Sequence, residues 1–216
     1  MQFNPGAFNR HLAHMGQAVT WRQAYACPCK NPTSGAADTK CPHCGGKGQQ
    51  WVAALDTVCG VADQKTQAKW ANSGRWTDGD VVVSIPGDSP MWEIGQFDRV
   101  VLLNAADRFS QSLVRGHVAE RLVFATKVID RVFWLAPVTR ALVEGGIPTL
   151  DPQGRPSWAA GEPPPGVTYS ITGQKFAEYY CFDNTVKSRN EHGGARLPKH
   201  VVLRRWDLWG RSSPTM

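Results

Sequence analysis

The segment Thr77-Asp78-Gly79-Asp80-Val81-Val82-Val83-Ser84-Ile85-Pro86 joins a polar turn to a run of β-branched residues, and it predicts a β-strand. Similar runs occur on both sides of it, among them Val58-Cys59-Gly60-Val61 and Arg99-Val100-Val101-Leu102-Leu103. Gly, Asp, Asn and Pro separate these runs, which is typical of short strands joined by turns. The predicted fold class is mainly β, either a β-barrel or a β-sandwich.

Further segments downstream have the β-branched and aromatic content of strands. They are residues 120–129, 131–137, 140–144, 167–173, 176–182 and 199–208, and Asp151-Pro152-Gln153-Gly154 is expected to form a tight turn. Between residues 105 and 113 the periodicity does not decide between a helical turn and a loop. We therefore predict one β-rich domain over residues 51–209.

A chain of this size needs neither a metal nor a disulfide in order to fold. With 216 residues and 23.7 kDa, it can form one large or two small domains and bury a core of its own. Near the start, Phe8, His11, Leu12 and Met15 recur at the spacing of an amphipathic helix. We expect an N-terminal arm at residues 1–24 and a C-terminal tail at residues 210–216.

The most specific chemical signal is the stretch from Cys27-Pro28-Cys29 to Cys41-Pro42-His43-Cys44-Gly45-Gly46-Lys47-Gly48. Two cysteine pairs on tight turns can share one Zn²⁺, which prefers four tetrahedral ligands. We therefore predict a structural zinc site in a module of residues 25–50, the cysteine module. Its expected ligands are Cys27, Cys29, Cys41 and Cys44, which leave no open position for catalysis.

Two alternatives for the cysteines stay open. His43 could replace one thiolate, and the four cysteines could instead be free thiols or form two disulfides. The polar loop between the pairs has nothing apolar to pack, so we expect it to be ordered by the metal. Cys59 and Cys181 are expected to be buried small hydrophobic residues.

Positive charge is concentrated near the C-terminus. The formal net charge is +6, and residues 187–211 hold seven Lys or Arg against two acidic residues. Such a segment can face nucleic acid, an acidic protein surface or solvent. The candidate residues for contact with a partner or nucleic acid are Lys187, Arg189, Arg196, Lys199, Arg204 and Arg205.

Neither an enzyme nor a membrane protein is expected. The sequence has no Gly-rich phosphate loop, nucleophile elbow or metalloprotease histidine pair. It also has no signal-peptide core in its first 15 residues and no run near the ~20 apolar residues that span a bilayer. A non-enzymatic protein that starts in a cytoplasm, without membrane contact, is the prediction.

The cysteine stretch with Asp38 between its pairs is followed by Pro165-Gly166-Val167-Thr168-Tyr169 and Leu197-Pro198-Lys199-His200-Val201-Val202-Leu203-Arg204-Arg205. In this arrangement the chain resembles small structural proteins of tailed bacteriophages and prophages. The resemblance covers residues 25 to 206 and is strongest at the cysteines. It implies a virion component of the head-to-tail connector or neck, assembled in the host cytoplasm.

The same resemblance implies the partners. Copies would form a homo-oligomeric ring, in which the N-terminal arm and the cysteine module dock on neighbours. Basic faces would meet other virion proteins, such as portal, adaptor or tail components, or DNA in a channel. Another tail or baseplate component and a zinc-ribbon nucleic-acid-binding protein are the alternatives.

Overall fold

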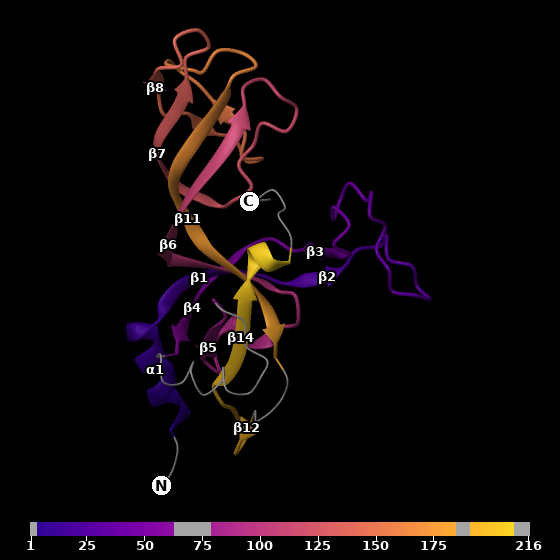
Figure 1. Cartoon of the computed structure of the whole chain (residues 1–216). Coiled ribbons are helices and arrows are strands. Elements are labelled where there is room, and N and C mark those ends of the chain that lie inside the picture. The colour runs from indigo at the N-terminus through magenta and orange to yellow at the C-terminus, as the bar shows by residue number, and fades with distance from the viewer. Residues whose placement is uncertain (1–3, 63–78, 185–190, 210–216) are drawn as a thin grey trace. The chain divides into compact units, whose positions relative to one another are not determined.

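The computed structural model describes residues 4–62, 79–184 and 191–209 (Figure 1). It is mainly β, with 46% strand and 9% helix, which confirms the predicted class. The described chain divides into two compact units. The barrel unit comprises residues up to Asn104 together with Glu178–Trp209, and the sheet unit comprises Ala105–Ala177. No helix of the described part is long and apolar enough to cross a membrane.

The barrel unit is a closed six-stranded barrel. Its strands follow the order β14-β5-β4-β1-β6-β11, and the pairing of β11 with β14 closes the ring. Val19, Val82 and Leu203 are buried in it, and along β1 buried residues alternate with partly exposed ones. The strands are β1 (Gln17–Arg22), β4 (Leu55–Val61), β5 (Val81–Ile85), β14 (Lys199–Arg205), the first part of β6 (Arg99–Val114) and the last part of β11 (Thr168–Asp183).

The predicted N-terminal helix is present as α1 (Pro5–Met15). The side chain of Asn4 caps it by accepting a hydrogen bond from the backbone N–H of Ala7 at 3.2 Å. Leu12 is buried against β4, where a Cβ added at Gly60 would lie 2.6 Å from its Cδ2. The helix therefore packs on the barrel of its own chain, and glycine in β4 makes room for it.

The sheet unit is an antiparallel sheet with its own core. Its strand order is β6-β11-β7-β8, with β7 at Thr126–Leu135 and β8 at Leu142–Glu144. A two-stranded hairpin of β9 (Thr149–Leu150) and β10 (Pro156–Ser157) accompanies it. The core is formed by Phe109, Leu113, Leu122, Ile129, Val132, Tyr169 and Ile171.

Residues 105–113, which periodicity left undecided, form part of β6. Phe109 and Leu113 face the core and lie four residues apart, a spacing that suits either a strand or a helix. The predicted turn at 151–154 is present. There the Asp151 carboxylate accepts hydrogen bonds from the backbone N–H groups of Gln153 and Arg155, at 2.9 and 2.8 Å.

The structure divides the chain differently from the predicted boundaries. The predicted β-rich domain at 51–209 spans both units, and the barrel takes in β1 from the predicted arm at 1–24. The predicted tail at 210–216 lies outside the described residues. The remaining elements are β2 (Ala24–Ala26), β3 (Gln49–Trp51), η2 (Pro90–Glu93), β12 (Glu191–His192), β13 (Ala195–Arg196) and η3 (Trp206–Leu208).

Candidate metal centre

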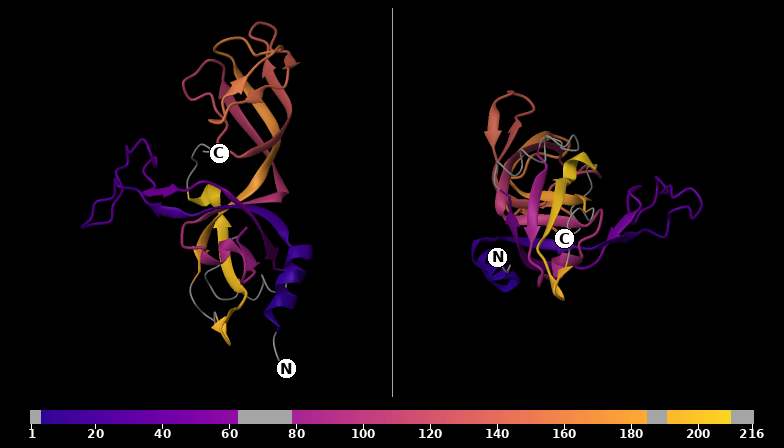
Figure 2. Two further views of the ribbon diagram at one scale, coloured as in Figure 1. Left: turned by 180° about the vertical axis from the view of Figure 1, so that it is seen from behind. Right: turned by 90° about the horizontal axis from the view of Figure 1, so that it is seen from below.

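The cysteine module stands on a two-stranded ribbon of the barrel unit. In this ribbon, β2 pairs with β3 in antiparallel register, Ala24 opposite Trp51 and Ala26 opposite Gln49. The backbone N–H of Cys27 then donates to the carbonyl of Gly48 at 2.9 Å and extends the pairing into the module. Both Figure 1 and Figure 2 show the ribbon leading away from the barrel strands of its unit.

The four predicted ligands lie together. Their Sγ atoms are all within 4.8 Å of one another. Two of the separations are 3.9 Å, between Cys27 and Cys41, and 3.5 Å, between Cys29 and Cys44. A tetrahedron with metal–sulfur bonds of about 2.3 Å has edges of about 3.8 Å, so four cysteines in this arrangement could hold a metal ion.

The alternatives for the cysteines can be judged from the same geometry. None of the four forms a disulfide, because the Sγ separations exceed by far the ~2.05 Å of an S–S bond. His43 is exposed, and the cluster of close ligand atoms is made by the four cysteines without it. The arrangement therefore favours the all-cysteine set over one that includes the histidine.

Tight turns within the second half of the module aim these side chains at one point. The backbone N–H of Gly45 donates to the carbonyl of Cys41 at 2.9 Å, and the backbone N–H of Lys47 donates to the carbonyl of Cys44 at 3.1 Å. Gly45 and Gly48 have φ angles of 57° and 71°, in the left-handed region that favours glycine. The N–H of Gly48 also points at Cys44 Sγ, 3.2 Å away, where it stabilises a thiolate.

The cluster affects the acidity of its thiols unequally. Burial raises the pKa of Cys44, but hydrogen bonds from the backbone of Gly48 and Gly46 and from neighbouring thiols outweigh it, and the pKa is lowered to about 7. Burial and hydrogen bonds to the other three cysteines raise the pKa of Cys29 to about 12, despite an opposing backbone hydrogen bond at Asp38. The cluster thus loses its first proton readily, and the negative charge of the resulting thiolate makes the remaining thiols harder to deprotonate.

Little besides the cysteines packs inside the module. Its buried cluster consists of Cys27, Cys41 and Cys44, with Cys29 packed against it. The loop between the pairs is held by local hydrogen bonds, such as those that the Asn31 side chain accepts from the following backbone at 2.8 and 3.0 Å. With so small a core, we expect the module to need ligation of its sulfurs for a stable fold.

An aromatic cluster of the barrel unit anchors the module. Lys47, three residues after Cys44, places its Nζ 4.6 Å from the centre of the Trp206 ring. Trp206 also makes edge-to-face contacts with Trp51 of the ribbon and with Trp209, at 5.1 and 5.3 Å between ring centres. Sequence reasoning missed this cluster because its members lie far apart in the chain.

A buried carboxylate fixes the start of the ribbon. Asp98 accepts hydrogen bonds from the indole N–H of Trp21 at 2.8 Å and from the backbone N–H groups of Ala24 and Gly95 at 2.7 and 2.9 Å. Burial raises the pKa of this carboxyl group, and the three hydrogen bonds oppose the rise. Asp98 thus joins β1, β2 and a neighbouring turn at one point, a role that no local sequence signal indicated.

The predicted basic residues are engaged within the chain where the structure describes them. Arg196 pairs with Glu93 at 2.8 Å and lies over the ring of Trp92. Lys199 donates to the carbonyls of Trp92 and Ile94, at 3.3 and 3.2 Å. These two cations therefore hold η2 against the barrel.

The next two basic residues also have internal partners. Arg204 pairs with the buried Asp80 at 2.9 Å and lies 3.5 Å from the centre of the Phe182 ring. Arg205 pairs with Asp207. Lys187 and Arg189 lie outside the described residues. Each of the four candidate basic residues that the structure describes therefore has a partner within the chain.

The two remaining cysteines are buried as predicted. Cys59 and Cys181 are fully inaccessible, and burial raises the pKa of each thiol to about 12. Such thiols are unreactive because the thiolate is the reactive form. They belong to the core of the barrel rather than to the candidate metal centre.

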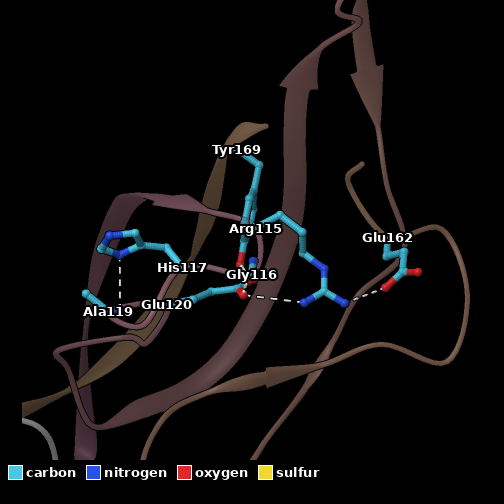
Figure 3. A network of polar contacts seen from close by, with 7 residues as sticks. All are labelled: Arg115, Gly116, His117, Ala119, Glu120, Glu162 and Tyr169. Carbon is cyan, nitrogen blue, oxygen red and sulfur yellow. Dashed lines mark hydrogen bonds and ion pairs between the residues drawn. The ribbon is translucent and has the colours of Figure 1, made fainter. Parts of the chain in front are cut away.

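A separate polar network lies in the sheet unit (Figure 3). The Glu120 carboxylate accepts hydrogen bonds from the Tyr169 hydroxyl and from the backbone N–H of Gly116, both at 2.6 Å. Arg115 reaches Glu120 at 3.4 Å and Glu162 at 2.6 Å. Burial raises the pKa of the Tyr169 hydroxyl, and the hydrogen bond to Glu120 and the charge of that carboxylate raise it further. Because these groups satisfy one another, we interpret the network as structural.

The chain was compared with protein-family models and with curated proteins, and neither comparison found a match. The chemistry of the cysteine cluster is therefore inferred from its own donor atoms. Four convergent sulfurs, with the backbone N–H of Gly48 beside them, could hold a thiophilic metal ion.

Proposed function

We propose that the chain is a non-enzymatic virion structural protein, a ring subunit of the head-to-tail connector of a tailed phage. In this proposal the cysteine module, held by Zn²⁺, is a contact element between subunits or with another virion protein. The observation that supports it best is the module itself, a loop with a cysteine core carried on a ribbon that leads away from the barrel. The reason to place the protein in a virion is its resemblance in sequence to structural proteins of tailed bacteriophages.

Zinc is the metal that the donor set favours. A tetrahedral set of four sulfurs suits Zn²⁺ or an iron centre, and the module has the short ligand spacings of structural zinc sites. Four protein ligands leave no position for a water or substrate. The metal would then shape the module without taking part in a reaction.

Protein contact fits the surroundings of the module. Tyr25 on β2 is 49% exposed, and Val52, which follows β3, is 46% exposed. These exposed aromatic and aliphatic side chains on the ribbon could contribute to a protein interface. The partner can be a neighbouring copy in a ring or another component of the particle.

The nucleic-acid alternative receives less support from the described residues. Arg196, Arg204 and Arg205 pair with acidic residues of the same chain. A nucleic-acid surface needs several cations that are available for phosphate. Contact with DNA therefore stays the second candidate, and the following experiment separates it from assembly.

The purified chain is examined for ring formation by electron microscopy and light scattering, with and without a chelator. We expect rings for the metal-loaded protein and smaller species for Cys41→Ser, while circular dichroism retains the β signal of the two units. His43→Ala is the matched control and should assemble normally. If the isolated protein stays monomeric and binds DNA with a steep loss of affinity in salt, the nucleic-acid alternative replaces this proposal.

A further inference from the structure

Exposed apolar side chains gather around the β7–β8 hairpin of the sheet unit. Leu135 at the end of β7 is 42% exposed, Val138 in the connecting turn 92% and Leu142 at the start of β8 69%. Ile147, shortly after β8, is 61% exposed. Scattered exposed apolar residues are normal, but a group of them beside a hollow marks an interaction site.

A hollow of about 500 Å³ lies at this hairpin. Its apolar lining includes Phe133, Leu135, Pro137 and Leu142, and Thr168 of β11 borders it. Phe133 follows Val132 of the core, so alternation along β7 turns it to the face of the sheet opposite the core. The volume of the hollow lies in the range of binding pockets and is large enough for one or two apolar side chains.

Arg140 also lines this hollow, and it is the one charged residue in the lining. Its backbone has a φ of 56°, in the left-handed region that glycine adopts at lower cost. A tight turn fixes this conformation, since the N–H of Arg140 donates to the carbonyl of Ala136 and the N–H of Ala136 donates to Ala141, at 3.0 and 2.9 Å. A strained, exposed arginine at the edge of a hollow suggests a role in binding.

We propose that the hollow is a docking site for a short extended segment of another protein. The segment inserts an apolar side chain beside Phe133 and Leu142 and places a carboxylate on the guanidinium of Arg140. The carboxylate follows from charge complementarity, because the charge in the lining is positive and arginine binds carboxylates through paired hydrogen bonds. The proposal uses no residue of the cysteine module and does not rest on the proposed function.

The test is a selection of displayed random peptides on the full-length protein, followed by affinity measurements with the enriched peptides. We expect these peptides to share an apolar residue next to an acidic one. Arg140→Gln should weaken their binding about tenfold, the loss expected for one charge-assisted hydrogen bond, and Arg140→Lys should lose less. Leu142→Asp should remove binding while the circular dichroism spectrum stays unchanged.

Arg131→Gln is the matched control. Arg131 lies on the same hairpin, has a 65% exposed side chain and faces Glu144 at 3.7 Å rather than the hollow. Equal affinity of the peptides for wild type and Arg140→Gln, or no enrichment over a selection on Leu142→Asp, overturns the proposal. So does a change of oligomeric state in either variant, which would make a second copy the occupant. Binding of free hexanoate as tight as that of the peptides would make it a small-molecule site and also overturn it.

Discussion

The Nζ of Lys47, in the cysteine module, lies 4.6 Å from the centre of the Trp206 ring. Trp206 begins η3, the 3₁₀ turn that follows the last barrel strand. The guanidinium of Arg99 lies 4.7 Å from the same ring. Lys47 is three residues beyond Cys44, so the turn that positions this cysteine also positions the cation. The cysteine cluster and the C-terminal aromatic cluster are thereby connected through one side chain.

Removal of the metal should therefore change the environment of Trp206. When the module loses its order, Lys47 no longer has a fixed position over the ring. With fluorinated tryptophan incorporated, the ¹⁹F resonance of Trp206, assigned through Trp206→Phe, should shift on chelation and shift similarly in Lys47→Met. Lys40→Met is the control, because Lys40 is an exposed residue of the same module. An unchanged resonance on chelation would show that the two sites are independent.

The titration of Lys47 should be visible in the stability of the protein. Burial, with a smaller effect of Arg99, lowers its pKa from 10.5 to about 8. Between these values the unfolded chain binds more protons at this site than the folded chain, so the free energy of unfolding rises with pH there. Denaturation of wild type and Lys47→Met from pH 7 to pH 10.5 should show a steeper rise in the wild type than in the variant. Parallel curves for the two proteins would contradict the lowered pKa.

Asp98→Ala should be one of the more damaging substitutions in the barrel unit. It leaves three hydrogen-bond donors, on Trp21, Ala24 and Gly95, without their acceptor. Each unsatisfied buried donor costs about 1–3 kcal/mol, so we expect the free energy of unfolding to fall by about 3 kcal/mol or more. Asp56→Ala should change it by less than about 0.5 kcal/mol, since its hydrogen bond with Thr20 is exposed. Similar losses for the two variants in urea denaturation would contradict this account.

Tyr169→Phe should weaken the sheet unit selectively. It removes the hydroxyl that donates to the buried Glu120 carboxylate, at an expected cost of about 1.5–3 kcal/mol for a bond to a charged group. Hydrogen exchange followed by mass spectrometry should show lost protection in residues 105–177 and unchanged protection in the barrel strands. Ser112→Ala is the control, because its hydrogen bond with Ser170 is exposed. Uniform loss of protection across both units would indicate that they unfold together.

The sequence contained enough to predict the β class and the four cysteines that the structure brings together. Runs such as Val81–Ile85 are strands because β-branched residues fit a pleated, buried surface, and turn residues bound them. The paired cysteines and the glycines after Cys44 specify, through local geometry alone, a compact loop in which four sulfurs converge. Both features depend on residues close together in the chain.

Features that depend on distant residues were not predictable in this way. β6 and β11 each continue without a break from one unit into the other, so no loop marks the boundary between the barrel unit and the sheet unit. The basic C-terminal residues had the composition of a binding surface. Arg204, however, forms an ion pair with Asp80, which directly precedes β5. The two residues meet only because β5 pairs with β14.

The central claim is that Cys27, Cys29, Cys41 and Cys44 together hold one zinc ion that builds the module. Metal analysis combined with zinc X-ray absorption on the purified protein tests it most directly. We predict one zinc per chain, with four sulfur neighbours at about 2.3 Å, and loss of this signal in Cys41→Ser but not in His43→Ala. A nitrogen or oxygen neighbour, another metal, or a metal-free protein with these cysteines in disulfides would contradict it.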